Sequence, residues 1–318
     1  MVNIYGVDLS IIIVNWNVKE LLRNCLNSIY EKTQGFSFEI IVVDNASTDG
    51  SVEMVSSEFP QVKLLINAEN LGFAKANNLA VPFTTGHYIA LLNPDTVLLN
   101  DAFRMMIEKL ETEDEIGIVG PKLINSDGKV QRVCARRFNK SNNGIKQMVL
   151  NGRLTSLYFD NDEEYEQSQT VDCVTGACLI LRRNILKNEY IFDPQFFMYG
   201  EDVDLCYETI QRGSKVFYLS EACVRHYGGE SSKQTPLSSL YDFEAGYRLI
   251  NKRYGRLFGN LYRFLNLLIS AFKLIFISLV LLFPWARHNQ ICIRRKQMYP
   301  QIILFALHPV SRDKYFRK

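Results

Sequence analysis

YIALLNPDTVL, residues 88–98, joins an apolar run to a polar turn. The apolar run has the length of a buried strand, and it ends at Asn93-Pro94-Asp95. Pro94 fixes its own φ and moves Asn93 away from helical geometry, so the chain must turn there. Ligands of open α/β sheets bind at the carboxyl ends of strands, where Asp95 would meet a metal ion or a phosphate. The alternative is an ordinary turn, in which Asp95 caps a helix over 100–110.

Short apolar runs alternate with helical spacing on either side of this stretch. Strands are predicted over 9–17, 38–51 (ending in a polar turn), 62–67, 88–92 and from 116 to 119, and helices over 19–31, 51–57 and 73–81. This β-α-β-α rhythm predicts a parallel sheet with helices on both faces. The pattern weakens between 139 and 172, where 158–169 is predicted to be a mobile acidic loop. Further strands are expected at 175–183 and 215–220, with a turn and helix over 196–213 between them.

Three predicted strand ends carry polar side chains, which a doubly wound sheet would bring to one crevice. They are Asn15-Trp16-Asn17, Asp44-Asn45 and Asn93-Pro94-Asp95. Gly72 and a predicted helix N-terminus lie on the same edge, an arrangement that suits an anion or a hydroxylated ligand. The chain has no G-x-G-x-x-G, which argues against a Rossmann dinucleotide site. For Asp44, Asn45 and Asp49 the alternative is turn chemistry with a helix cap.

The net charge of +2 hides a strong division along the 318 residues. Residues 1–244 contain 22 Lys and Arg and 33 Asp and Glu, a net of −11, whereas residues 245–318 contain 14 and one, a net of +13. Such a basic segment is typical of proteins that bind a polyanionic partner, either nucleic acid or an anionic membrane. The seven cysteines form no C-x-x-C pair, which favours reduced thiols in a cytosolic protein and argues against zinc.

The basic segment also contains a long apolar run, which favours the membrane. Residues 264–283 are long enough to span a bilayer. A polar stripe at helical spacing instead favours an amphipathic helix in the membrane plane, and it consists of Arg256, Asn260, Arg263, Asn266, Ser270 and Lys273. A lysine near mid-bilayer is costly, so we expect monotopic attachment rather than a single span. A soluble dimerisation helix is the remaining alternative.

Six motifs stand in an order that resembles the family 2 inverting glycosyltransferases of the GT-A fold, and most closely their bacterial rhamnosyltransferase-like branch. They are SIIIVNWN (10–17), IIVVDNASTDGS (40–51), NLGFAKANN (70–78), ALLNPDT (90–96), TGACLILRR (175–183) and FFMYGEDVDLCY (196–207). The resemblance covers residues 8–230. It implies a Rossmann-like mixed, mostly parallel sheet with helices on both faces, followed by a membrane-associated helical tail. We therefore expect a GT-A domain over 1–245 and the tail over 246–318.

The resemblance implies a nucleotide-sugar site with a divalent metal. Val14 and Trp16 would line the base pocket, Asp44 would hydrogen-bond the pyrimidine ring, and Asn77 or Asn78 would lie near the ribose or diphosphate. Asp95 matches the last acid of the family's D-x-D motif, which here is Asn93-Pro94-Asp95. The missing acid leaves His226 and the donor phosphates to complete the metal shell, and this oxygen-rich set suits Mg²⁺ or Mn²⁺. The alternative for His226 is a structural histidine.

The resemblance also implies an acceptor site. Asp202 would act as the catalytic base, and Glu201 would bind acceptor hydroxyls or orient the loop. Gly176 would let the acceptor approach the backbone, and Arg136, with Arg132 and Arg137, would bind an acceptor phosphate. The alternatives are acids that stabilise a helix N-terminus and a solvated basic face.

The expected function is inverting, metal-dependent transfer of a hexose in cell-surface polysaccharide biosynthesis. The resemblance implies L-rhamnose from dTDP-rhamnose, or another dTDP- or UDP-sugar, and a lipid-linked or cell-surface glycan acceptor. The tail predicts location at the cytoplasmic face of the cell membrane. The missing D-x-D acid motivates a rival, a non-catalytic membrane-attached protein that binds a nucleotide-sugar or glycan. A nucleic-acid partner fits the basic tail but not the acidic body, so none is expected.

Overall fold

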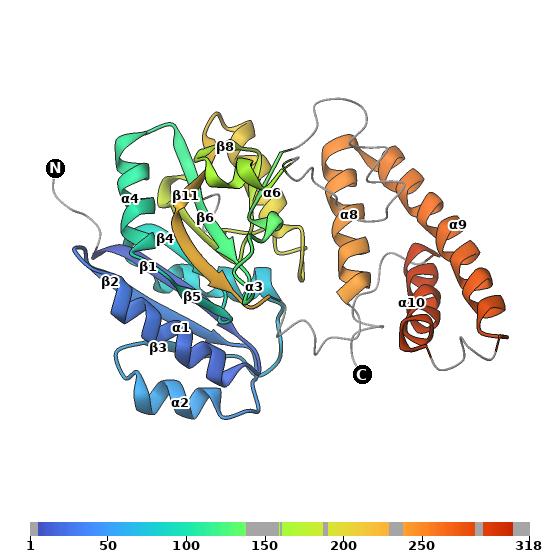
Figure 1. Cartoon of the computed structure of the whole chain (residues 1–318), viewed down its shortest axis with the longest axis horizontal. Helices are drawn as coiled ribbons and strands as arrows, with labels where there is room; N and C mark the ends of the chain where they lie inside the picture. Colours follow the sequence, from blue (N-terminus) through green and yellow to red (C-terminus); the bar gives the residue numbers. More distant parts are fainter. Residues whose placement is uncertain are drawn as a thin grey trace. The chain divides into compact units, whose positions relative to one another are not determined.

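The structure is a computed structural model that describes residues 6–137, 159, 161–186, 190–228, 238–283 and 289–307. The chain divides into two compact units, drawn in Figure 1. The first contains Met1–Lys140 and Ser156–Thr235, and the second contains Ser141–Thr155 and Pro236–Lys318. The domain boundary expected at 245 falls inside helix α8 (Ser238–Tyr254), which belongs whole to the second unit.

Nine strands of the described chain form one mixed sheet in the first unit, in the order β3-β2-β1-β4-β10-β6-β11-β5, with β8 paired to β11. The strands are β1 (Val7–Asn15), β2 (Phe38–Asp44), β3 (Lys63–Ile66), β4 (Gly86–Leu92), β5 (Thr96–Leu98), β6 (Ile116–Ile124), β8 (Gln169–Val171), β10 (Cys178–Arg182) and β11 (Lys215–His226). β-Branched residues fill the buried centres of β1 and β2, as expected for strands covered on both faces. The mixed α/β sheet with packed helices fits the GT-A architecture.

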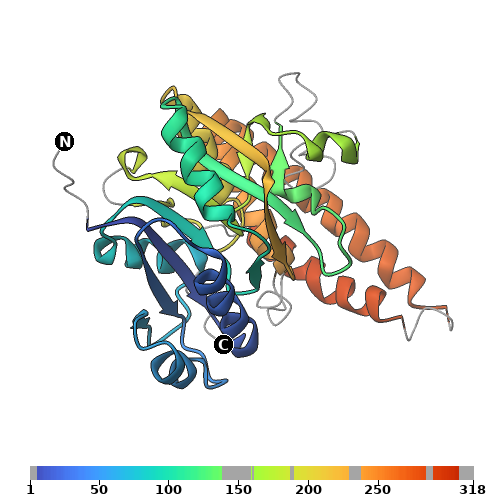
Figure 2. The ribbon, with the colours of Figure 1, turned by 60° about the vertical axis from the view of Figure 1, so that its left-hand side comes forward.

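The helices of this unit connect the strands and cover the sheet. They are α1 (Lys19–Lys32), α2 (Ser51–Glu58), α3 (Phe73–Ala80), α4 (Ala102–Thr112) and α6 (Glu201–Gln211). Figure 2 shows α1 and α4 over one face of the sheet. Helix α3 packs on β1 and β2, and α6 packs on β6 and β11. Leu22, Leu26 and Ile29 of α1 are buried, in agreement with the helical spacing of these residues in the sequence.

The order of the strands reverses between β1 and β4. From β1 the chain proceeds outward through β2 to β3, and then returns to β4 on the other side of β1. All three pairings are parallel, so the carboxyl ends of these strands share one edge. A crevice at such a reversal is where open α/β sheets bind ligands. The edge therefore contains the polar strand ends that the sequence singles out.

Two parts of the first unit differ from the expected pattern. β10 lies antiparallel between β4 and β6, so the sheet is mixed, as the family resemblance implies and as the residue rhythm alone does not predict. The acidic stretch predicted to be a mobile loop forms the 3₁₀ helix η3 (Asp162–Glu166). Tyr165 explains the order, because its fully buried ring donates a hydrogen bond from Oη to the carbonyl of Arg132 at 2.9 Å. A single buried aromatic residue outweighs the polar composition around it.

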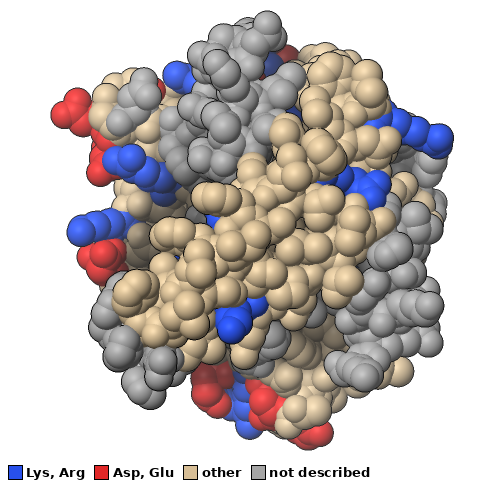
Figure 3. All heavy atoms as spheres, turned by 90° about the vertical axis from the view of Figure 1, so that its right-hand side faces the viewer, with Lys and Arg blue, Asp and Glu red and all other residues tan. Residues whose placement is uncertain are grey.

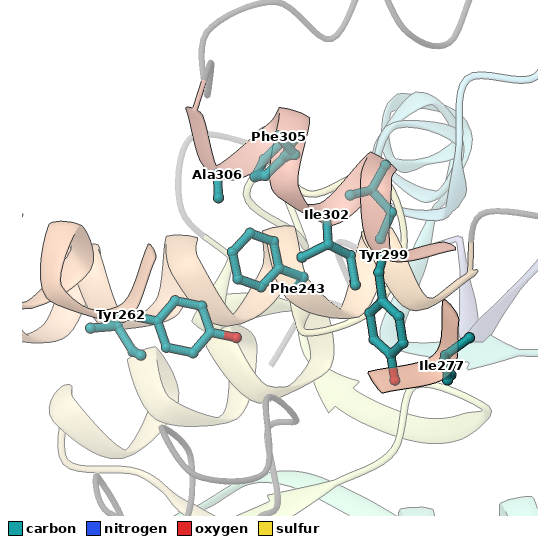
Figure 4. Packing of buried hydrophobic residues seen from close by; sticks show 9 residues of the cluster. Phe243, Tyr262, Ile277, Tyr299, Ile302, Phe305 and Ala306 are labelled. Atoms are coloured by element: carbon teal, nitrogen blue, oxygen red, sulfur yellow. The ribbon is translucent and has the colours of Figure 1, made fainter. Parts of the chain in front are cut away.

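The described residues of the second unit form three helices, α8, α9 (Arg256–Val280) and α10 (Gln290–Leu307). Its core brings together side chains from all three, as Figure 4 shows. Phe243 of α8 stacks on Tyr262 of α9, with ring centroids 5.3 Å apart, and meets Phe305 of α10 edge to face at 5.6 Å. Gly246 allows α8 to approach α9 closely, because a Cβ at this position would lie 2.5 Å from the Tyr262 hydroxyl.

Three residues of the polar stripe of α9, Arg263, Asn266 and Ser270, lie against the neighbouring helices, whereas Arg256, Asn260 and Lys273 are exposed. Asn266 and Ser270 are only 5% and 4% exposed, and Asn266 Nδ2 donates to the Tyr262 carbonyl at 2.9 Å. Arg263 donates from Nη2 to the carbonyl of Ala306 in α10 and lies over the Tyr247 ring of α8. The central part of the stripe is therefore covered by protein. The reason is that α8 and α10 offer carbonyl and aromatic partners that the helix alone lacks.

The close approach at Gly246 gives a stability prediction. Gly246→Ala should lower the free energy of unfolding by about 1–3 kcal/mol, the usual cost of overpacking. Chemical denaturation followed by circular dichroism measures the change. The Tyr262→Phe background provides the control, because removing the hydroxyl removes the nearest atom, and the alanine should then cost less. An alanine that is neutral in the original background would contradict the packing described.

Candidate functional site

The ends of β1 and β2 are joined by a buried polar network. Asn15 pairs with Asp44 in the parallel register, and its Nδ2 donates to Asp44 Oδ2 at 2.9 Å and to Ser47 Oγ at 3.1 Å. Asp44 Oδ1 accepts from the backbone N–H of Ser47 at 2.8 Å. Asn15 Oδ1 is buried, with no hydrogen-bond partner among the described residues. Because a buried acceptor without a partner is costly, this atom points to a ligand at the edge.

The residues expected to line a base pocket lie beside this network. Val14 is buried on β1, whereas the Trp16 side chain, two residues further, is partly exposed. Asn17 has a left-handed φ of 55°, and its Oδ1 accepts from the Thr48 N–H at 2.7 Å. The turn after β1 is therefore fixed to the turn after β2, with Trp16 between them. The roles of Val14, Trp16 and Asp44 toward a nucleotide stay predictions.

Asp49 has the capping role that is the alternative reading of its sequence position. Its carboxylate accepts from the N–H of Lys19, at the start of α1, and from the N–H and hydroxyl of Ser51, at the start of α2. Burial raises the pKa of this carboxyl, but the hydrogen bonds from Ser51 and Lys19 outweigh it and hold the pKa below its usual value. One ionised side chain thus caps two helices.

Asp95 and His226 lie together at the end of β4. Asp95 Oδ1 is 3.3 Å from His226 Nε2, and both side chains are largely buried. Asn93, at the first position of the D-x-D-like motif, places its Nδ2 3.4 Å from the same imidazole nitrogen. Below the turn, the Cys25 thiol contacts the Asn93 carbonyl, and burial raises the pKa of this thiol to about 12. The thiol therefore stays protonated and supports the turn.

Gln131 determines which imidazole nitrogen of His226 carries the proton. Gln131 Nε2 donates to the His226 carbonyl at 2.6 Å, and since a carbonyl only accepts, the orientation of the amide is set. Gln131 Oε1 then faces Nδ1 at 2.8 Å and accepts its proton. In the neutral imidazole, Nε2 is then an acceptor that lies 3.3 Å from Asp95 Oδ1 and 3.4 Å from Asn93 Nδ2, which can donate to it. Two acceptors this close are favourable only if a cation or a proton lies between them.

This donor set fits a divalent metal. A carboxylate oxygen, an imidazole nitrogen and a nearby amide match Mg²⁺ or Mn²⁺, and the donor phosphates would supply further oxygens. Adjacent ligands of an octahedral ion with bonds of about 2.1 Å lie roughly 3 Å apart, close to the Asp95–His226 spacing. No group of three His, Cys, Asp or Glu residues that could hold a metal occurs in the part of the chain that the structure describes.

The turn before α6 packs against the loop before α3. Phe73 N–H donates to the Phe197 carbonyl at 2.7 Å. Gly72 is required there, because its φ is +80° and a Cβ would lie 2.5 Å from that carbonyl. Tyr199 and Gly200 then both adopt left-handed φ before α6 begins at Glu201. Backbone strain of this kind persists only where the surroundings hold it, which is common at functional sites.

Asp202 is held by three N–H donors. Arg136 Nη2 and the Gly176 N–H donate to Oδ2 at 3.1 and 3.2 Å, and the Val203 N–H donates to Oδ1 at 2.7 Å. These bonds fix the orientation of the carboxylate. Glu201 and Asp204, on either side, are more deeply buried than Asp202. Asp202 is thus the most exposed acid of the three, as a base must be to meet a substrate.

The structure gives several predicted residues additional contacts. Arg136 is buried against Asp202 and Cys173, on the short strand β7 (Ala135–Arg136) that pairs with β9 (Cys173–Val174). A Cβ at Gly176 would meet only ordinary van der Waals contacts with protein atoms, so packing does not require this glycine, and its role in the approach of an acceptor stays a prediction. Gly228, two residues after His226, has a left-handed φ of +75°, and Gly229 lies outside the described residues.

Asn77 and Asn78 bind protein groups. Asn77 Nδ2 donates to the Phe73 carbonyl within α3 at 2.9 Å. Asn78 Nδ2 donates to the Phe192 carbonyl at 2.7 Å, and its Oδ1 accepts from the N–H groups of Ile191 and Phe192. Asn78 therefore anchors the segment that leads to the α6 turn. Contacts of either residue with a ribose or diphosphate stay predictions.

Gln131 is the functional residue that sequence reasoning missed. It stands in a stretch without periodicity, before the 3₁₀ helix η2 (Arg132–Cys134), and no motif marks it. The six residues from Gln131 to Arg136 connect both halves of the site, because the first holds His226 and the last holds Asp202. Arg132 pairs instead with Asp162, and Arg137 pairs with Glu164.

Comparison with known proteins identifies the family. The model described as Glycosyl transferase family 2 matches residues 10–189, more than half of the chain. The chain belongs to glycosyl transferase family 2. The family predicted from the six motifs is thereby confirmed. The polar strand ends described above therefore belong to a family 2 glycosyltransferase.

This family 2 glycosyltransferase has rhamnosyltransferases among its relatives. The N-acetylglucosaminyl-diphospho-decaprenol L-rhamnosyltransferase of Mycobacterium tuberculosis is 27% identical over 219 residues, which are 63% of this chain and 70% of that protein. The O-antigen chain rhamnosyltransferase RfbN of Salmonella typhimurium is 26% identical over 221 residues, covering 69% and 66%. The chain is therefore rhamnosyltransferase-like.

A solved structure supports the GT-A fold. The mannosyltransferase PcManGT from Pyrobaculum calidifontis, in complex with GDP-Man and Mn²⁺, has a TM-score of 0.54 and 14% identity, covering 97% of this chain and 89% of that one. At this identity the likeness concerns the fold alone.

The hydrogen bonds of Gln131 predict an effect on metal affinity. Gln131→Leu should weaken Mn²⁺ binding in the presence of nucleoside diphosphate about 10- to 100-fold, as loss of a group that orients a metal-binding histidine usually does. Electron paramagnetic resonance of free Mn²⁺ measures the affinity without requiring turnover. Gln167→Leu, an exposed glutamine of the same unit, is the matched control. Equal affinity of the two variants would show that Gln131 does not orient the ligand.

Proposed function

We propose that this glycosyltransferase moves L-rhamnose from dTDP-L-rhamnose to a hydroxyl of a lipid-linked glycan, with inversion and with the help of Mg²⁺ or Mn²⁺. The observation that carries the proposal is the pairing, in one unit, of a fixed carboxylate at Asp202 with the facing acceptor atoms of Asp95 and His226. The rhamnosyltransferase names of two relatives support the sugar.

In this reaction the side chains of the protein carry out one proton transfer. Asp202 accepts the proton of the acceptor hydroxyl as its oxygen bonds to the anomeric carbon, and the bond from that carbon to the diphosphate oxygen breaks. The nucleoside diphosphate leaves with the electron pair from the opposite face, so the configuration inverts. Arg136 and the Gly176 N–H keep the carboxylate aligned, which supports positioning as the role of Arg136.

The other half of the site would bind the donor. Asp95 and His226 would hold the divalent ion, which when bound neutralises charge on the leaving diphosphate. Asn93 carries no charge where the family motif has an acid, so the donor's own oxygens must contribute more of the shell. The unpartnered Asn15 Oδ1, next to Asp44, is the atom best suited to accept a hydrogen bond from the nucleobase.

Loss of the base should separate binding from chemistry. Asp202→Asn keeps the shape and size of the side chain and its ability to form hydrogen bonds, but the amide cannot take the proton, so kcat should fall about 10²- to 10⁴-fold. Donor affinity, measured by calorimetry, should change little. Asp114→Asn, at an exposed acid of the same unit, is the control. Transfer that persists undiminished in the Asp202 variant would remove this residue from the mechanism.

The missing acid at Asn93 supports a second candidate, a non-catalytic protein that binds the nucleotide-sugar or a glycan. Incubation with dTDP-rhamnose, UDP-GlcNAc and GDP-mannose, each with Mn²⁺, Mg²⁺ or EDTA, distinguishes the two. We expect metal-dependent release of dTDP, fastest from dTDP-rhamnose and suppressed by EDTA. Tight binding without release from any donor would favour the binding protein.

A further inference from the structure

The strongest feature outside the site is a row of exposed apolar side chains along α9. The side chains of this row follow one another at steps of three, four and occasionally one residue, and all are exposed. They are Leu257, Leu261, Phe264, Leu268, Phe272, Ile275, Phe276, Leu279 and Leu282. Phe272 is 71% and Leu257 79% exposed. Figure 3 shows that the centre of the surface on this side of the molecule has few charged side chains. Monomeric soluble proteins rarely expose so continuous a row.

The polarity of α9 is inverted relative to a helix of a soluble protein. Its buried positions include Gly259, Asn266 and Ser270, whereas most of its exposed positions are leucine, isoleucine and phenylalanine, and Arg256, Asn260 and Lys273 are its exposed polar residues. This arrangement of buried polar and exposed apolar residues is unfavourable in water, because apolar area exposed to water costs free energy. A hydrocarbon phase favours it, since polar groups are then satisfied internally and apolar groups contact the solvent.

The neighbouring helix excludes a complete span. Helix α8 packs along α9 and carries Glu244, Arg248, Lys252 and Arg253, with an ion pair between Glu244 and Arg248 at 2.6 Å. If α9 crossed the bilayer, these charges would be carried into or beside its core, which is costly. Only one face of α9 is therefore available to lipid. The 25-residue helix passes the length and hydropathy criteria for a span, but those criteria do not include its neighbours.

Charge complementarity identifies the occupant of the exposed row. Residues 245–318 carry a net charge of +13, so two copies meeting through this face would repel each other. An anionic membrane surface would attract it, with Arg256 at one end of the helix and Arg295 and Lys296 in α10 available to headgroups. Length fits as well, because α9 is roughly 38 Å long at 1.5 Å per residue and lies along the interface without needing to match its thickness.

We propose that the outward row of α9 is a membrane-docking surface that inserts into one leaflet of an anionic bilayer, with α9 in the membrane plane and α8 and α10 on its water side. This inference stands on the helices alone and does not depend on the chemistry of the first unit. It places Asn266 and Ser270 of the polar stripe against protein, where an ordinary amphipathic helix would present its polar face to water.

Vesicle binding of the full chain tests the surface. We expect co-sedimentation with phosphatidylglycerol-containing vesicles, weaker with pure phosphatidylcholine and weaker at high salt. Phe272→Ser, Ile275→Ser and Phe276→Ser together should lower the partition coefficient roughly 100-fold, because three apolar anchors are lost. The matched control replaces three comparably exposed residues of the first unit, Ile66, Phe83 and Tyr190, by serine and should bind as the original does. Unchanged binding of the α9 variant would overturn the proposal.

Two further measurements separate this arrangement from its rivals. Single tryptophans at 264, 272 and 279, in a background with Trp16 and Trp285 replaced by Phe, report depth through quenching by brominated lipids. These positions span roughly 22 Å of helix. Equal, shallow depths support α9 in the plane, and a depth that changes along the helix would overturn it in favour of a span. Light scattering of the protein without lipid tests whether a second copy covers the α9 row. A dimer that forms with the original chain and that the triple α9 variant abolishes would overturn the proposal.

Discussion

β5 and β11 pair antiparallel with His226 opposite Thr96, and the donor half of the site depends on this register. Asp95 directly precedes Thr96, and the Tyr227 N–H extends the ladder to the Asp95 carbonyl at 2.9 Å. The carboxylate and the imidazole are therefore placed by backbone hydrogen bonds, before any ligand arrives. A shift by one residue would turn the His226 side chain to the other face of the sheet.

The second half of the site is fixed to the first by short chain segments. Gln131 and Arg136, at the two ends of six residues, hold His226 and Asp202 respectively. Gly72 and Phe197 join the loop before α3 to the turn before α6. A family 2 glycosyltransferase needs donor and acceptor aligned to within a fraction of an ångström, and these contacts supply rigidity where the loops alone would not.

Local sequence patterns predicted most of the first unit because its elements are defined by nearby residues. The β-branched run before Asn15, the apolar run before Asn93 and the spacing of α1 each specify an element without help from distant parts. The antiparallel insertion of β10 was not predictable, since strand direction follows from chain connections and leaves no mark on residue periodicity. Gln131 was missed for a similar reason, because its partner lies 95 positions away.

Helix α9 shows which of its properties the sequence determines and which the tertiary structure determines. Its sequence determines that the polar residues Asn266 and Ser270 share one face and the large apolar residues share the other, because helical geometry fixes the angle between successive side chains. The sequence of α9 does not determine which face meets solvent. That choice is made by α8 and α10, whose carbonyl and aromatic groups cover the polar face and leave the apolar face exposed. Periodicity is a property of one helix, whereas burial is a property of the helices packed around it.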